Sequence, residues 1–149
     1  MIISHQHKYI FIKTFKTAGT SVEIALSKYC GPDDIITAIE PEDEAVRREL
    51  GYRGPQNDRI PFSRYGLGDY ARALHKRRLL RFTNHVGAEF IQKYIDPEIW
   101  NSYFKFAFER NPWDRMLSGY FFRNPVEPRK SIDDFIASGR ANTFGGFEL

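Results

Sequence analysis

Cysteine is nearly absent from this sequence. Cys30 is the only one among 149 residues, so no internal disulfide can form and a metal site made only of cysteines is excluded. Such a chain suits a reducing compartment, and we expect a cytoplasmic location. The N-terminus shows no basic segment followed by a long apolar run, so we expect no signal peptide. No window is long and apolar enough to span a bilayer, so we also expect no membrane partner.

Repeats, low-complexity tracts and a strong charge of one sign are absent too. The formal net charge is +3 and the isoelectric point is about 9.0. This balance permits an anionic ligand but lacks the dense basic patch of most nucleic-acid-binding domains, so we expect no nucleic-acid partner. Aromatic residues are plentiful, with 13 Phe and eight Tyr. That composition argues against disorder and predicts one domain over residues 1–149.

The first candidate for a functional segment is the stretch KTFKTAGTS at residues 13–21. It follows the apolar run Tyr9–Ile12, which predicts a buried strand. Thr20, with Glu23 three residues later, predicts a capping box at the start of a helix. The expected buried face of that helix consists of Val22, Ala25, Leu26 and Tyr29.

A loop between a strand and a helix N-terminus can cradle a phosphate or sulfate, because the first N–H groups of the helix are unpaired. Gly19 permits close approach of the backbone to an oxyanion, and Lys16 supplies a full positive charge. Hydroxyl groups come from Thr17, Thr20 and Ser21. The lysine precedes the glycine, so the stretch is not a Walker A loop. An ordinary polar turn explains the same residues, and this stretch alone leaves both interpretations open.

Helical patterns also occupy the middle of the chain. A long surface loop is expected over residues 51–68, and Asp69 is a candidate N-cap for a helix that runs to about Leu80. The other helices are expected at Pro41–Leu50, at Gly87–Ile95 and after the Asp96-Pro97 pair.

A second strand-to-helix unit begins at Tyr103–Phe108, where alternate positions are Phe. Asn111 and the following proline predict a helix start. Arg110 precedes this start and Ser118 lies about two turns along the helix, so both could hold one phosphate. Alternatively, Arg110 and Arg115 pair with nearby acids on the surface. A short last helix is expected at residues 131–138. Two such units predict an α/β fold in which helices flank a parallel sheet.

The two motifs together resemble those of the sulfotransferases that use 3′-phosphoadenosine 5′-phosphosulfate (PAPS), in the carbohydrate sulfotransferase branch of bacteria and the Golgi. KTAGTS, at residues 16–21, is similar to the family's 5′-phosphosulfate loop, and RNPWDRMLSGY, at residues 110–120, to its 3′-phosphate motif. Phe15 replaces the usual proline, and Glu109 replaces a small apolar residue beside the phosphate site. The resemblance implies a P-loop-like three-layer fold with a central parallel sheet, the donor PAPS, and a hydroxyl acceptor on a small molecule or glycan.

The resemblance also implies roles for individual residues. Arg110 and Ser118 would hold the 3′-phosphate of the donor. The 5′-phosphosulfate would be held by Lys16, Thr17, Ala18, Gly19, Thr20 and Ser21. Lys16 would in addition neutralise the departing oxygen, and no metal is required.

A general base is still needed for the acceptor hydroxyl. His85 is the strongest candidate, because an imidazole accepts a proton near neutral pH and relatives often carry a histidine between the two motifs. Glu89 could replace His85 as the base or orient it. A helix-start histidine bonded to backbone is the alternative for His85. His5 and His7 are expected in a frayed N-terminus, and His75 on a basic helix face.

Several alternatives remain open at this point. The basic run at residues 76–81 could attract an anionic acceptor, although a solvated helix face is favoured. The chain is short for the family, and its tail NTFGGFEL does not resemble a closing element, so a truncated fold is one expectation. A relative that binds PAPS without turnover and a P-loop kinase-like phosphotransferase remain as other functions. The acceptor and the oligomeric state are not predicted.

Overall fold

The computed structural model describes residues 1–139, which fall into two compact units. Unit 1 comprises residues 1–13 and 20–107, and unit 2 comprises residues 14–19 and the chain from residue 108 on. The strands lie in unit 1, whereas unit 2 holds residues 14–19 of the KTFKTAGTS stretch and the last two helices. The tail NTFGGFEL lies outside the described residues.

Four short strands form one mixed sheet in unit 1. They are β1 (Ile2–Ser4), β2 (Tyr9–Phe11), β3 (Ile35–Ile36) and β4 (Phe104–Phe106), in the order β3-β1-β2-β4. β2 and β4 are parallel, as predicted for the strands of the two strand-to-helix units, but β1 is antiparallel to both of its neighbours. The prediction of a wholly parallel central sheet is therefore wrong.

The difference arises at the N-terminus, where a tight turn joins β1 to β2. Lys8 adopts a left-handed conformation with φ 54°. The Asp34 carboxylate accepts hydrogen bonds from the backbone N–H of His5 at 2.6 Å and from the Ser4 hydroxyl at 3.0 Å. The His7 ring also contacts the backbone carbonyl of Tyr29 at 3.2 Å. The prediction of a frayed N-terminus is wrong, because these side-chain bonds hold the hairpin in place.

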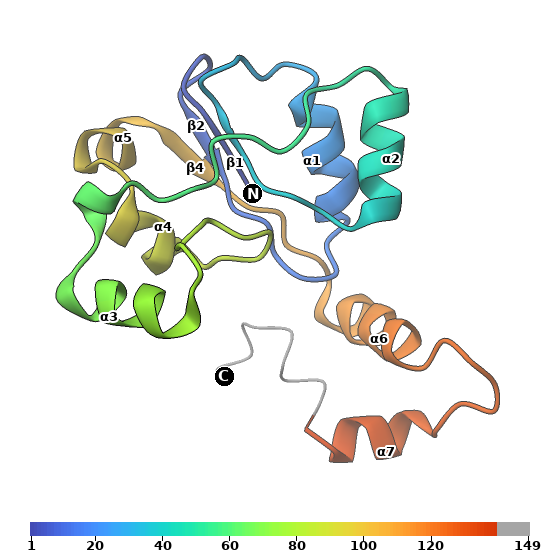
Figure 1. The fold of residues 1–149 in the computed structure, drawn as a ribbon. Helices are drawn as coiled ribbons and strands as arrows, with labels where there is room; N and C mark the ends of the chain where they lie inside the picture. Colours follow the sequence, from blue (N-terminus) through green and yellow to red (C-terminus); the bar gives the residue numbers. More distant parts are fainter. Residues whose placement is uncertain (140–149) are drawn as a thin grey trace. The chain divides into compact units, whose positions relative to one another are not determined.

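Helices cover both faces of this sheet in unit 1 (Figure 1). On one face, Ile2 and Phe11 pack against Val22 and Leu26 of α1 (Gly19–Ser27), and α2 (Pro41–Glu49) lies on the same side of the sheet. On the other face, Ile3 and Ile10 pack against α4 (Ala88–Tyr94) and α5 (Pro97–Ser102). The alternation of side chains along each strand thus divides the core into two clusters.

The predicted helices at Pro41–Leu50, at Gly87–Ile95 and after Asp96 are confirmed. Asp96 caps α5 by accepting a hydrogen bond from the N–H of Glu98. The prediction of Asp69 as the N-cap of the next helix is wrong, because α3 (Leu67–Lys76) begins earlier, with Gly66 at its N-cap. This helix also ends before the predicted Leu80, where Arg77 turns left-handed at φ 48°. A short 3-10 helix, η1 (Phe62–Arg64), precedes α3 within the predicted surface loop.

The predicted orientation of α1 is only partly confirmed. Val22 and Leu26 face the core, but Ala25 is exposed and Tyr29 is 58% exposed. Glu23 is fully buried and forms ion pairs in place of the predicted capping box. The sequence did not predict that Glu23 is buried, because the cations that pair with it come from distant parts of the chain.

Unit 2 contains a helical pair, α6 (Pro112–Arg123) and α7 (Ile132–Ala137). Asn111, predicted to start the first of these helices, caps it by accepting from the N–H of Trp113. Ser131 caps α7 by accepting from the N–H of Asp134. A small core holds the pair together, formed by Met116, Tyr120, Ile132 and Phe135.

Candidate anion-binding site

Residues 14–19 of the KTFKTAGTS stretch, which belong to unit 2 and which we call the loop, have an unusual backbone. Lys16 and Ala18 are both left-handed, each with φ 60°. Left-handed residues alternating with ordinary ones point successive N–H groups into a concavity that suits an anion. Non-glycine residues rarely adopt this conformation, and such strain is concentrated at functional sites. The sequence predicted that Gly19 would allow the backbone to approach an anion, but Gly19 is the first residue of α1.

Hydroxyl groups brace the loop from within. The Thr14 hydroxyl donates to the backbone carbonyl of Phe108 at 2.6 Å. Thr17 is buried, and its hydroxyl lies 2.9 Å from that of Thr14. Thr14 was not among the predicted site residues, although it is one of the four hydroxyl side chains in the quoted stretch. The Thr14 hydroxyl holds the loop by bonding to Phe108, about ninety residues later in the chain, so only the folded structure could identify this role.

Lys16 and Arg110 converge on one open pocket of about 570 Å³ in unit 2. A guanidinium nitrogen of Arg110 approaches the backbone carbonyl of Lys16 to 3.5 Å. Ser118 also lines this pocket, on the same helix that Arg110 precedes. The remaining walls are apolar except for one acid, and consist of Asp114, Leu117, Phe121 and Phe122. Two cations and a hydroxyl therefore meet in one concave site.

The electrostatics of this pocket favour an anion. Partial burial, and then the neighbouring Arg110 guanidinium, lower the pKa of the Lys16 ammonium. The Lys16 nitrogen lies 4.2 Å from the centre of the Phe122 ring, a cation–π contact. An anionic group bound between the two cations would offset their repulsion and stabilise the charged lysine.

The acid next to Arg110 is engaged elsewhere. Glu109 accepts from the Arg115 guanidinium at 2.8 Å and from the backbone N–H of Arg110 at 3.1 Å. The arginine–acid pair considered from the sequence therefore forms at Arg115, whose side chain is buried rather than on the surface. Within residues 1–139, no ion pair involves the Arg110 guanidinium. Its charge is consequently directed to the pocket rather than to Glu109.

The other predicted site residues belong to unit 1. Thr20 and Ser21 lie in the first turn of α1. His85 lies in the turn before α4 and donates to the backbone of Lys13, so the alternative of a backbone-bonded histidine describes its geometry. Burial, and then Lys13, lower the pKa of His85, which keeps the ring neutral near pH 7. Glu89 is exposed in the first turn of α4.

A buried ion cluster in unit 1 joins the chain segment before the loop to helix α1, which follows the loop. Lys13 ends the segment before the loop, and its ammonium lies 3.3 Å from the Glu23 carboxylate of α1. Arg47 of α2 lies 3.6 Å from the other Glu23 oxygen, which also accepts from Thr37 at 3.1 Å. Lys13, Glu23 and Arg47 are buried. Within unit 1, this cluster ties the end of the β2 segment to α1 and to α2.

The described residues contain neither a metal-like cluster nor a membrane-spanning helix. Within residues 1–139, no three His, Cys, Asp or Glu side chains are grouped as metal ligands. None of the helices in that range is both long and apolar enough to cross a bilayer.

Comparison with known proteins identifies the family. No curated protein and no solved structure matches the chain. The family model described as the sulfotransferase family matches residues 1–143, and so includes the loop, the pocket and His85. Because this match spans nearly the whole sequence, the chain belongs to the sulfotransferase family.

Proposed function

We propose that this protein transfers a sulfuryl group from PAPS to a hydroxyl, most simply on a carbohydrate. The observation that carries the proposal is the convergence of Lys16, Arg110 and Ser118 on one pocket. Membership of the family implies a sulfate donor. The resemblance of both motifs to the carbohydrate sulfotransferase branch supports the choice of PAPS and of a sugar acceptor.

The residues present fit such a donor, which is anionic at both its 5′ and 3′ positions. The N–H groups and the lysine of the loop suit the 5′-phosphosulfate. Arg110 and Ser118 suit the 3′-phosphate, because a guanidinium fork matches phosphate geometry. The aromatic rings of Phe121 and Phe122 line the same pocket and would pack against a purine.

Catalysis in this scheme depends on placing the acceptor oxygen against the sulfuryl group and on neutralising the charge of the departing oxygen. The bound donor supplies the sulfuryl group, which the acceptor oxygen attacks. Lys16 neutralises the negative charge on the departing phosphate oxygen, assisted by the loop N–H groups. His85 accepts the proton of the acceptor hydroxyl, so that the new S–O bond forms as the old one breaks. The lowered pKa of His85 keeps it in the required neutral form.

The pH dependence of turnover tests this role for His85. Since burial lowers its pKa from the ordinary 6.5, kcat/KM should rise with pH and reach half its maximum below that value. His85→Asn should remove this acid limb and lower the rate by about 10²–10⁴-fold. A Glu89→Gln variant serves as the control for the competing base. Loss of the limb in Glu89→Gln, with the limb intact in His85→Asn, would assign the base to Glu89.

Thermal unfolding with the desulfated donor, 3′-phosphoadenosine 5′-phosphate (PAP), tests the proposal directly. PAP at about 100 times its Kd should stabilise the fold by about 2.7 kcal/mol and raise the Tm by several degrees. Arg110→Ala should reduce this stabilisation to about 0.4–1.4 kcal/mol, because it binds PAP about 10- to 100-fold more weakly, whereas Arg48→Ala, at an exposed arginine of α2, should retain the full shift. No shift with saturating PAP would refute the proposal.

The same experiment separates the alternatives. A phosphotransferase would be stabilised by ATP with Mg²⁺ rather than by PAP, and we expect no such shift. A relative that binds without turnover would show the PAP shift but transfer no sulfate from PAPS to a panel of sugars and alcohols. Sulfate transfer to any member of that panel therefore distinguishes the enzyme from the binding protein.

A further inference from the structure

Helix α3 of unit 1 turns its apolar side to the solvent. Leu67 and Leu74 are 91% and 83% exposed, and Tyr70 is 47% exposed. These positions are spaced by three and four residues, so they share one side of the helix. Phe62 of η1, also exposed, stacks on the Tyr70 ring with centroids 6.4 Å apart. We call Phe62, Leu67, Tyr70 and Leu74 the α3 apolar face.

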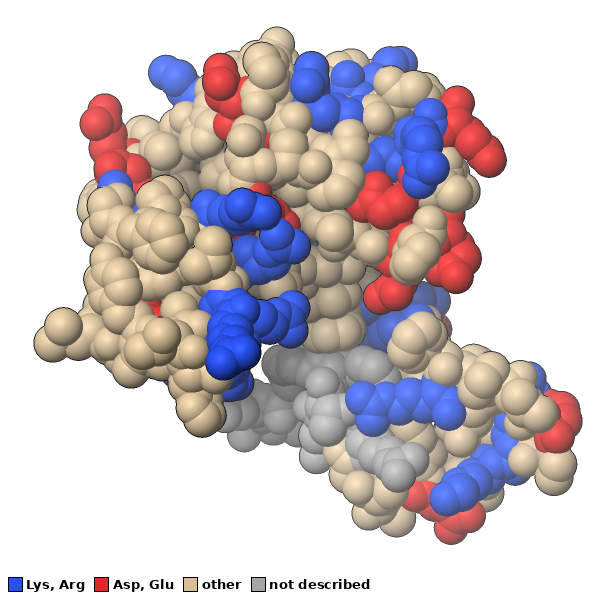
Figure 2. All heavy atoms as spheres, viewed as in Figure 1, with Lys and Arg blue, Asp and Glu red and all other residues tan. Residues whose placement is uncertain are grey.

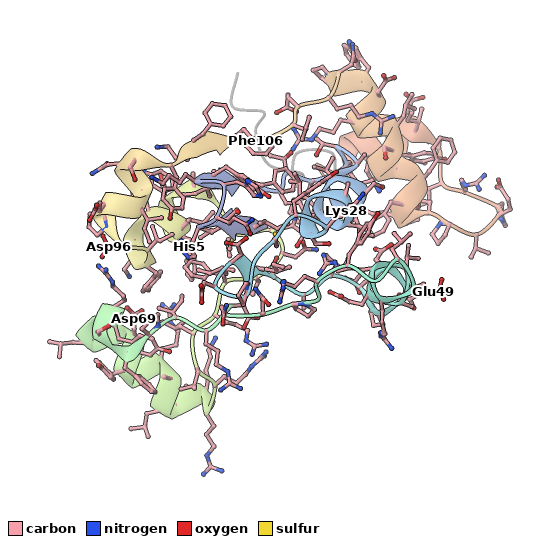
Figure 3. The ribbon with its side chains drawn as sticks, turned by 90° about the horizontal axis from the view of Figure 1, so that it is seen from above. His5, Lys28, Glu49, Asp69, Asp96 and Phe106 are labelled. Carbon is pink, nitrogen blue, oxygen red and sulfur yellow. The ribbon has the colours of Figure 1, made fainter. Side chains whose placement is uncertain are left out.

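The orientation of α3 is held by a buried acid rather than by apolar packing. Asp69 is the buried residue of the helix, and it accepts from the Tyr94 hydroxyl at 2.8 Å and from the N–H of Gly66 at 3.0 Å. Lys93 adds an ion pair at 3.6 Å. Figure 3 shows Asp69 on the side of α3 that faces the rest of unit 1. The polar side of the helix is therefore anchored inward, and its leucines project outward.

Basic residues adjoin this apolar face, and we call them the basic strip: Arg59, Lys76, Arg77, Arg78 and Arg81. α3 ends in Lys76, and Arg77 and Arg78 follow it, all three exposed. Beyond them the chain is extended, and Arg81 pairs with Arg59 in an antiparallel bridge. Partners in such a bridge project to the same side, and like charges there destabilise each other. Figure 2 shows Lys and Arg gathered beside the tan surface of α3.

This strip carries excess positive charge. One acid, Asp58, lies near it, 3.6 Å from the Arg81 guanidinium. Within the described part of the chain, Arg59 forms no ion pair. The basic residues are thus not spread over one solvated helix face, as expected from the sequence. They gather at the end of α3 and on the extended segment after it, next to exposed leucines.

We propose that the α3 apolar face and the basic strip together bind the surface of an anionic lipid bilayer. An amphipathic helix with basic residues beside large apolar ones lies in the plane of the interface, with its apolar side among the acyl chains. Anionic headgroups neutralise the arginines. A dissolved polyanion would satisfy the charges but would leave Leu67 and Leu74 in water. The inference replaces the sequence-based expectation of no membrane partner, and it is independent of the proposed sulfotransfer.

Vesicle sedimentation of the whole protein tests the proposal. We expect binding to vesicles of phosphatidylcholine mixed in equal amounts with phosphatidylglycerol, and little binding to phosphatidylcholine alone. The double variant Leu67→Ser, Leu74→Ser should bind at least about tenfold more weakly. Arg77→Gln with Arg78→Gln should weaken binding and reduce its sensitivity to salt. The matched control is Val46→Ser with Leu50→Ser, exposed apolar residues at the end of α2, which should bind as the native protein does.

All variants alter exposed side chains, so an unchanged Tm verifies that each one folds. Equal binding of the native protein and the leucine variant would overturn the proposal and indicate a surface for dissolved polyanions. Failure to bind either kind of vesicle would also overturn it. So would concentration-dependent self-association that the leucine variant abolishes, because the occupant of the face would then be a second copy of the chain.

Discussion

Replacing Lys16 by Met is expected to lower the rate of sulfuryl transfer by about a hundredfold to a thousandfold, the usual effect of removing one group that stabilises developing charge. The lysine lines the pocket with Arg110, and methionine keeps its length without its charge. The loss should appear in kcat more than in KM, because the charge on the departing oxygen develops only in the transition state. Steady-state kinetics with PAPS and an active acceptor measure this.

Lys28→Met is the matched control, since Lys28 is an exposed lysine just beyond the end of α1. It should leave both kinetic constants unchanged. A Lys16→Met enzyme that keeps its kcat would show that the leaving oxygen is neutralised by another group. A rise in KM alone would restrict Lys16 to holding the donor.

Replacing Glu23 by Ala is expected to destabilise the protein by about 3–5 kcal/mol, because it leaves buried cations without their counterion. The Lys13 ammonium and the Arg47 guanidinium lie 3.3 Å and 3.6 Å from this carboxylate. Burial already lowers the pKa of Lys13, and Glu23 opposes that effect. Denaturant unfolding measures the change as a fall in the midpoint at constant m-value.

Glu49→Ala, at the exposed end of α2, is the control and should alter the free energy of unfolding by less than about 0.5 kcal/mol. The double variant Glu23→Leu with Lys13→Met removes one opposite pair together. It should be less destabilised than Glu23→Ala, because fewer buried charges stay uncompensated. If Glu23→Ala costs under about 1 kcal/mol, the cluster does not hold unit 1 together.

Elements with strong local signals were predictable from the sequence. A cap residue followed by proline correctly predicted the starts of two helices: Asp96-Pro97 for α5 and Asn111-Pro112 for α6. In both helices the cap residue accepts the expected hydrogen bond. The parallel pairing of β2 with β4 followed from the repetition of a strand and a helix. In each case a few neighbouring residues contain the necessary information.

Features that depend on distant partners were not predictable. The two-residue strand β3 pairs with β1 across some thirty residues of chain, and neither has a pattern long enough to recognise. Glu23 resembled a capping residue because the sequence does not show the cations that surround it. Arg77 ends α3 in a left-handed conformation without the glycine that usually marks such a stop.

In the anion-binding site, too, local motifs were predictable and interactions between distant residues were not. Two motifs about ninety residues apart indicated Lys16 and Arg110, and the structure brings both to one pocket. Two interactions could be identified only in the folded structure. They are the hydrogen bond from Thr14 to the Phe108 carbonyl and the ion pair between Glu109 and Arg115. Residue type and spacing identify which side chains carry charge, whereas only the fold decides which charges are already neutralised.

The central claim is that the loop and Arg110 hold opposite ends of one adenosine nucleotide. Calorimetric titration of PAP and of adenosine 5′-phosphate, which lacks the 3′-phosphate, tests it in the native protein, Arg110→Ala and Lys16→Met. We predict that the native protein prefers PAP by about 10- to 100-fold, that Arg110→Ala loses this preference, and that Lys16→Met binds both ligands more weakly while keeping it. An undiminished preference for PAP in Arg110→Ala would contradict the account.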